Sequence, residues 1–209
     1  RVIADNQAIA DYIYKTYGKC PAVIAYGGDH VVQDTKTHSV WADKHYALAL
    51  CRIEPENNVH LILEACVQAK FPLVFIGNWH VSEYGRNLKQ QYKHHALIEL
   101  LDAVYDQNEL APVRSHCAVY IHGHSAGGTN PSLVEMMMFG CPILAHDNVF
   151  NRATLENGGE YFNSVEALTG LLETPLDPKV GQQIKRTAMR RYLWRHILNS
   201  YSAELGLLR

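Results

Sequence analysis

A glycine-rich loop separates a predicted strand from a predicted helix in the middle of the chain. The loop consists of Gly127, Gly128, Thr129 and Asn130. Pro131 follows where a first helical residue should be, since its missing N–H costs nothing there, and we expect Thr129 or Asn130 to cap the helix. Glycines let the backbone approach a ligand closely, and a helix start offers free N–H groups to an anion. The loop is therefore predicted to bind a phosphate group.

Glu135 is the one charged residue on the apolar helix that follows this loop. A carboxylate in such surroundings is costly unless it has partners. Two ribose hydroxyls would satisfy it, because a carboxylate accepts several hydrogen bonds. The other interpretation is that Glu135 points to solvent or pairs with a nearby arginine. The sequence leaves both interpretations open.

Ser125 suggests a different enzyme class. The sequence Gly-His-Ser-Ala-Gly at residues 123–127 matches the nucleophile elbow of serine hydrolases. In that motif the serine leads directly into a helix, so Pro131 would fall inside the helix and disrupt it. Asp147 also follows only one strand later, and no oxyanion-hole segment lies upstream. We therefore treat a serine hydrolase as the alternative to nucleotide binding.

The bulk composition excludes some other functions. A net charge of −2 gives no general attraction to nucleic acid. The five cysteines are odd in number and lack metal-ligand spacing, as expected of thiols in a reducing compartment. No apolar run reaches the roughly 20 residues needed to cross a bilayer, and no signal peptide is recognisable. The chain begins at Arg1 in an apolar segment, from which we expect a piece of a longer protein.

Strands and helices are predicted to alternate along the chain. The predicted strands are 2–4, 22–28, 46–51, 72–77, 117–121 and 142–145, and the predicted helices are 7–17, 56–69, 88–101, 131–139 and 178–205. Several strands are apolar throughout, which is typical of a parallel sheet covered on both faces. We therefore expect an α/β fold with a doubly wound, Rossmann-like parallel sheet.

Five segments in the same order resemble the C-terminal domain of the family 4 retaining glycosyltransferases, which have the GT-B fold. They are residues 23–29 (VIAYGGD), 51–65 (CRIEPENNVHLILEA), 72–78 (PLVFIGN), 130–147 (NPSLVEMMMFGCPILAHD) and 191–205 (RYLWRHILNSYSAEL). The resemblance implies a chain in three parts. Residues 1–20 would be the tail of an N-terminal acceptor domain, 21–177 the nucleotide-sugar-binding domain, and 178–209 a C-terminal helix that packs back toward the absent domain.

The resemblance also implies roles for individual residues. Arg52 matches an arginine that neutralises the donor diphosphate, and Glu135 matches a glutamate that holds the ribose. Gly128, Thr129 and Asn130 match the loop that faces the diphosphate and sugar. Val104 and Tyr105 fall near the segment that meets the nucleobase. Apart from the resemblance, His122 or His124 is a candidate to touch a phosphate. Neither a metal nor another cofactor is implied, although His116 and His146 also lie in this part of the chain.

Two positions depart from the family pattern. Gly127 stands where the first glutamate of the family's two-glutamate motif is expected, and Asn57 stands where a phosphate-binding lysine is expected. A branch of the family that resembles bacterial rhamnosyltransferases has similar residues around these two positions. This suggests a UDP- or dTDP-sugar donor, with dTDP-rhamnose as one choice.

The expected activity is retaining transfer of this sugar to a saccharide or lipid-linked saccharide acceptor in surface polysaccharide synthesis. We expect a cytoplasmic protein that, through its basic last helix, can lie peripherally at the inner face of the membrane. A GT-B-like epimerase or nucleotide-sugar-binding domain is a second alternative.

Overall fold

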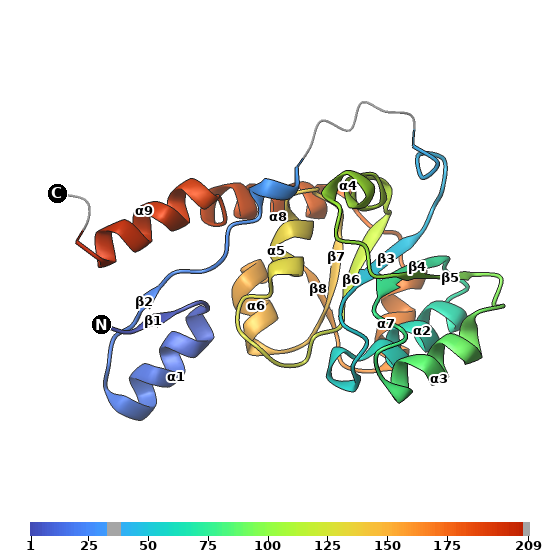
Figure 1. Ribbon diagram of the computed structural model, residues 1–209, viewed down its shortest axis with the longest axis horizontal. Helices are drawn as coiled ribbons and strands as arrows, with labels where there is room; N and C mark the ends of the chain where they lie inside the picture. Colours follow the sequence, from blue (N-terminus) through green and yellow to red (C-terminus); the bar gives the residue numbers. More distant parts are fainter. Residues whose placement is uncertain (33–38, 207–209) are drawn as a thin grey trace.

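The computed structural model describes residues 1–32 and 39–206 (Figure 1). The strands are β1 (Ile3–Ala4), β2 (Ala22–Val23), β3 (Ala47–Leu50), β4 (Leu73–Gly77), β5 (Ile98–Asp102), β6 (Val119–His122), β7 (Ile143–His146) and β8 (Glu160–Phe162). The α-helices are α1 (Gln7–Tyr17), α2 (Val59–Gln68), α3 (Glu83–Tyr92), α4 (Gln107–His116), α5 (Pro131–Met137), α6 (Val149–Leu155), α7 (Val165–Glu173), α8 (Pro178–Arg191) and α9 (Trp194–Glu204). Two short 3-10 helices are η1 (Asp29–Val31) and η2 (Pro55–Asn57).

Strands β3 to β8 form one six-stranded sheet in the order β5-β4-β3-β6-β7-β8, and every pair is parallel. The chain builds outward from β3 through β4 to β5, and then returns to the other side of β3 for β6. Ligands of such folds bind at the carboxyl ends of the two strands where the order reverses. The predicted doubly wound α/β fold is confirmed, and its ligand edge lies beyond β3 and β6.

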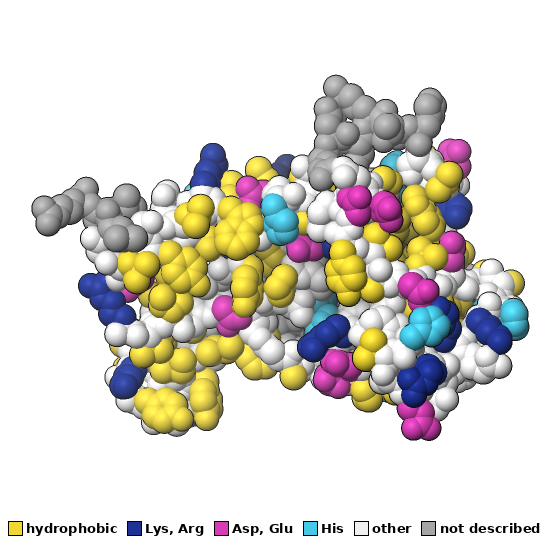
Figure 2. Space-filling model, viewed as in Figure 1, with side chains coloured by type: hydrophobic (Ala, Val, Ile, Leu, Met, Phe, Trp, Pro, Cys, Tyr) yellow, Lys and Arg dark blue, Asp and Glu magenta, His cyan; other side chains and the backbone are white. Residues whose placement is uncertain are grey.

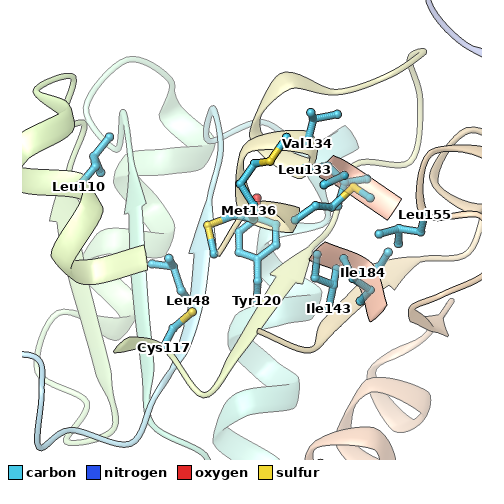
Figure 3. Packing of buried hydrophobic residues seen from close by; sticks show 14 of the residues in the cluster. Leu48, Leu110, Cys117, Tyr120, Leu133, Val134, Met136, Ile143, Leu155 and Ile184 are labelled. Carbon is cyan, nitrogen blue, oxygen red and sulfur yellow. The ribbon is translucent and has the colours of Figure 1, made fainter. Parts of the chain in front are cut away.

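Two apolar clusters cover the two faces of this sheet. Side chains alternate between the faces along a strand, so Leu48 packs with α4, α5 and α8, whereas Ala47 and Ala49 pack with α2, α3 and α7. Figure 3 shows the first cluster, where Tyr120 and Met136 meet between the sheet and α5. The methionines of α5 are fully buried, as expected of core residues.

The N-terminal residues form a separate unit beside the large sheet. Strands β1 and β2 pair in parallel with each other only, and α1 between them packs against α6 (Figure 1). Asn6 caps α1 by accepting a hydrogen bond from Ala8 N at 2.9 Å. The same side chain donates to the hydroxyls of Thr129 and Thr154, each at 3.2 Å. The N-terminal segment is therefore tied to the glycine-rich loop.

The predicted helix over residues 88–101 is wrong. The structure has α3 ending at Tyr92 and the parallel strand β5 over Ile98–Asp102. Helix α3 begins earlier, because Ser82 accepts a hydrogen bond from Gly85 N at 3.0 Å and so caps it. Strand β2 is also shorter than predicted, and α4, α6, β8 and α7 were not predicted.

The single last helix predicted over residues 178–205 is two helices. Helix α8 ends at Arg191 and α9 begins at Trp194. Gly28 N donates to the carbonyl oxygen of Tyr192 at 2.7 Å, and Trp194 N donates to Asp29 Oδ1, also at 2.7 Å. The break is therefore made by a segment far away in the sequence. Among the residues that the structure describes, no helix is both long and apolar enough to span a bilayer.

Candidate functional site

A pocket of about 520 Å³ opens at the carboxyl edge of the sheet, where it is lined by residues at the ends of β3, β4 and β5 and by residues that follow β6. Six of the residues predicted for the site line it: Arg52, Val104, Tyr105, His124, Asn130 and Glu135. The other lining residues are Leu50, Cys51, Ile76, Gly77, Asn78, Ala103, Pro131 and Ser132. Asn57, Gly127, Gly128 and Thr129, which were also predicted, do not line it. The strand-order reversal thus brings residues 52, 124 and 135 together.

Arg52 gives the pocket an available positive charge. Its side chain is 76% exposed, and its nearest carboxylate, Glu54, is 3.6 Å away between Nη2 and Oε2. An exposed pair at this distance is weak, so the guanidinium can turn to another anion. His124 adds no charge at neutral pH, because burial and the neighbouring Arg52 lower its pKa to about 4. Within this lining, the capacity to neutralise a diphosphate therefore rests on Arg52.

Asn130 sets the start of α5 at the pocket wall. Its Oδ1 accepts hydrogen bonds from Ser132 N at 3.0 Å and from Ser132 Oγ at 2.8 Å. Pro131 occupies the first helical position, as predicted from its missing N–H. Gly127 lies just before, exposed and with a φ of 111°, a conformation that favours glycine. Of the two predicted caps, Asn130 is the one that caps the helix.

Gly128 and Thr129 face the N-terminal segment. Thr129 is 4% exposed, and its hydroxyl donates to the carbonyl oxygen of Asp5 at 2.5 Å. The carboxylate of Asp5 occupies the space where a Cβ on Gly128 would stand. Gly128 and Thr129 therefore anchor the loop to residues 5 and 6.

Asn57 supports the backbone of the site but does not line the pocket. It is 3% exposed, and its Nδ2 donates to the carbonyl oxygen of Arg52 at 2.8 Å. The adjacent Asn58 donates to the carbonyl oxygen of Gly123, also at 2.8 Å. Because the carbonyl oxygen of Asn57 fills the place of a Cβ on Gly123, the η2 turn and the loop after β6 are in direct backbone contact.

Glu135 pairs with an arginine that the sequence did not single out. Arg114 Nη2 donates to Glu135 Oε2 at 2.5 Å, and the arginine side chain is 2% exposed. On the other side, His30 Nε2 lies 3.5 Å from Glu135 Oε1. The interpretation that Glu135 meets an arginine is thus realised, while the carboxylate still borders the pocket. No local pattern points to Arg114, because it follows Pro112 near the end of a mostly polar helix.

Among the residues that the structure describes, no catalytic triad surrounds Ser125. Its hydroxyl donates to the carbonyl oxygen of Glu56 at 2.8 Å, and Asp147 is paired with Arg152. Helix α5 begins only at Pro131, so the serine does not lead directly into a helix.

Two further features lie outside the predicted site. Over residues 1–32 and 39–206, no cluster of three or more His, Cys, Asp and Glu side chains is arranged to hold a metal ion. A larger hollow of about 680 Å³ lies at the opposite edge of the sheet, near Ala118 and Pro142, which precede β6 and β7. It contains none of the predicted site residues, and ligands of doubly wound sheets bind at the other edge. We therefore assign the smaller pocket as the candidate site.

Solved structures similar to this chain include proteins described as glycosyltransferases. HepE from Anabaena, crystallised with UDP and glucose, matches with a TM-score of 0.82 at 16% identity, over 99% of this chain and 63% of that one. Sucrose-phosphate synthase from Thermosynechococcus elongatus matches with a TM-score of 0.77 at 18% identity, over 99% and 58%. A glycosyltransferase from Rickettsia africae matches with a TM-score of 0.79 at 15% identity, over 96% and 61%. The chain therefore spans less than two thirds of these proteins.

These likenesses show a common fold, the Rossmann-like C-terminal domain of GT-B glycosyltransferases. No curated protein matches the chain by sequence. The model of the family described as glycosyl transferases group 1 matches residues 33–186, which include every residue assigned to the pocket. With most of its length matched, this chain belongs to the group 1 glycosyltransferases.

Proposed function

We propose that this chain is the donor-binding half of a retaining, family 4 glycosyltransferase. The observation that supports this most is that Arg52 and Glu135 border one pocket from the two sides of the strand-order reversal. A cation and a carboxylate in one cleft match the two polar parts of a nucleoside diphosphate, its phosphates and its ribose.

The proposed chemistry is mainly electrostatic. Arg52 stabilises the diphosphate as it leaves the sugar, and Asn130 and Pro131 at the start of α5 line the same pocket. Glu135 accepts hydrogen bonds from the ribose hydroxyls. Val104 and Tyr105 line the same pocket, and the 85% exposed ring of Tyr105 is free to stack on a nucleobase. Arg52 thus acts on the leaving group, and the other residues position the donor.

We propose a UDP- or dTDP-sugar as the donor. The crystals of HepE with UDP and with UDP-glucose support a pyrimidine nucleotide for this fold. Gly127 brings no carboxylate to the sugar, which agrees with a sugar with fewer hydroxyls, such as the rhamnose of dTDP-rhamnose. The proposed acceptor is a saccharide or lipid-linked saccharide of a surface polysaccharide.

We further propose that an N-terminal domain of the same enzyme covers the α1 and α9 side of this chain. Figure 2 shows hydrophobic side chains gathered over these two helices. The exposed large hydrophobic side chains of these helices are Tyr12, Tyr14 and Tyr17 of α1, with Trp194, Leu198 and Tyr201 of α9. In this proposal residues 1–20 and 178–209 belong to the domain junction. Because GT-B sites close between two domains, the chain alone would bind donor without transferring its sugar. Its free cysteines agree with a cytoplasmic location.

Calorimetry with UDP, dTDP, GDP, ADP and uridine tests the assignment of the site. Arg52→Ala should weaken UDP or dTDP binding roughly ten- to a hundredfold, the size of a charge-assisted hydrogen bond, and should barely affect uridine. Arg86→Ala is a matched control, because Arg86 is a surface arginine outside the pocket. Equal binding by the parent chain and Arg52→Ala would place the phosphate site elsewhere. Binding with no transfer by the complete two-domain enzyme would favour the epimerase or binding-domain alternative.

A further inference from the structure

Glu135 contacts two side chains from distant parts of the chain, one in a close ion pair and one at the limit of hydrogen-bond distance. Nη2 of Arg114 in α4 donates a hydrogen bond to Glu135 Oε2 at 2.5 Å, and Nε2 of His30 in η1 lies 3.5 Å from Glu135 Oε1. Each carboxylate oxygen has two lone pairs, so these contacts leave acceptor capacity for a ligand. Arg114 is 2% exposed and Glu135 15%, whereas the Arg52–Glu54 pair at the same pocket is largely exposed. The carboxylate is therefore fixed from the protein side and open on the pocket side.

The neighbours of Glu135 are themselves held in place. Arg114 Nη1 donates to Gln107 Oε1 at 2.9 Å, which fixes the plane of the guanidinium. Trp194 Nε1 donates to His30 Nδ1 at 3.1 Å. Because an indole nitrogen only donates, Nδ1 of His30 must be the acceptor, and the neutral ring carries its proton on Nε2. Nε2 lies 3.5 Å from Glu135 Oε1, so Trp194 sets the tautomer that keeps a proton on the nitrogen beside the carboxylate.

Trp194 is in turn fixed against η1. Its backbone N–H donates to Asp29 Oδ1 at 2.7 Å, and its indole ring fills the space where a Cβ on Gly27 would stand. Figure 1 shows η1 beside the junction of α8 and α9. The first residue of α9 thus forms one end of a chain of contacts that runs through His30 to Glu135 and Arg114.

We propose that Arg114 and His30 are positioning residues that orient the Glu135 carboxylate toward the two hydroxyls of a nucleotide ribose. The proposal deepens the function proposed above and rests on it. A glutamate side chain has several rotamers, and holding it in the binding rotamer removes an entropic cost of binding. Losing this support should therefore weaken ligands that have ribose hydroxyls, and leave ligands without them unchanged.

The test compares UDP with its dideoxy analogue, which lacks both ribose hydroxyls, by calorimetry. The parent chain should bind UDP about tenfold more tightly, the size of roughly one good hydrogen bond. His30→Ala should bring this ratio close to one by weakening UDP alone. His30→Gln, which keeps an N–H donor, should restore part of it. Trp194→Phe, which keeps a ring but loses the indole N–H, should lower it less than His30→Ala. Arg114→Lys should also lower the preference for UDP, because lysine keeps the positive charge but lacks the planar guanidinium group.

If Arg114 and His30 only stabilised the fold, their variants would behave differently. In that case each variant would lower the melting temperature and weaken both ligands equally, with the UDP preference unchanged, and the proposal would be wrong. His30 is 45% exposed at its side chain, so its variants should fold even if Arg114→Lys does not, and they then decide the question. Arg52→Ala is the control that should weaken both ligands alike. If the parent chain itself shows no preference for UDP, the ribose contact of the proposed function fails instead.

Discussion

Arg114 and Glu135 form an ion pair whose cation is almost fully buried, while its anion borders the candidate pocket. The pair joins α4 to α5 on one face of the sheet. Breaking a buried pair from one side leaves an uncompensated charge, which costs more than the net value of the pair. Glu135 therefore matters to the stability of the fold as well as to a ligand.

We expect Glu135→Ala to lower the free energy of unfolding by about 3 kcal/mol, because it strands the Arg114 guanidinium in the protein interior. Glu135→Gln should cost less, since its amide oxygen still accepts from the guanidinium. Glu54→Ala, which breaks only the exposed pair with Arg52, should cost about 0–1 kcal/mol. Urea denaturation measures all three. A Glu135→Ala protein as stable as the Glu54→Ala protein would contradict the burial of the pair.

We expect Gly123→Ala to destabilise the protein and to abolish nucleotide binding. The new Cβ would collide with the carbonyl oxygen of Asn57, a backbone atom that cannot rotate away, and would separate η2 from the loop after β6. Gly170→Ala is the matched control. It lies within α7 with no atom within 4 Å of its Cβ position, so it should stabilise by up to about 1 kcal/mol. Thermal melting distinguishes the two, and similar melting temperatures would refute the close contact.

We expect stability to fall as the pH is lowered from about 7 toward 4. Burial lowers the pKa of His122 and His146, and lowers that of His124 to about 4 from an ordinary 6.5. Below pH 6.5 these histidines bind protons in the unfolded chain but not in the folded chain. Their contribution to the free energy of unfolding is therefore fully present above pH 6.5 and is lost as the pH approaches 4. For His124 alone the loss is on the order of 3 kcal/mol. Denaturation at pH 7 and pH 5 should show a smaller difference for His124→Gln than for the parent chain; equal differences would disprove the role of His124.

We expect no labelling of Ser125 by a fluorophosphonate probe. Its hydroxyl is engaged with the Glu56 carbonyl oxygen, and no histidine is among its hydrogen-bond partners in the described part of the chain. The measurement is the mass of the protein after incubation with the probe. Stoichiometric labelling that disappears in Ser125→Ala would revive the hydrolase interpretation of the loop.

Local sequence signals were enough for much of the fold and for the centre of the site. The apolar strands, the Pro131 start of α5 and the Asn130 cap all depend on neighbours within a few residues, which is the range that periodicity and capping rules cover. The same local signal at Ser82 marks the true start of α3, and the predicted helix over 88–101 missed it. Arg52 and Glu135 were expected together from the resemblance to the family, and the pocket contains both.

The partners of these residues were decided only by the tertiary structure. Arg114 reaches Glu135 across 21 positions, Thr129 reaches Asp5 across 124, and Asp29 reaches Trp194 across 165. No local rule reports on such pairs, because they depend on how the parallel strands and their crossover helices are packed. Patterns in the sequence predicted a doubly wound sheet and a carboxylate after a glycine-rich loop, and the family resemblance added the cation Arg52. Packing decided that the carboxylate is clamped by a buried arginine, that Thr129 turns to the N-terminal segment, and that the last helix breaks at Tyr192.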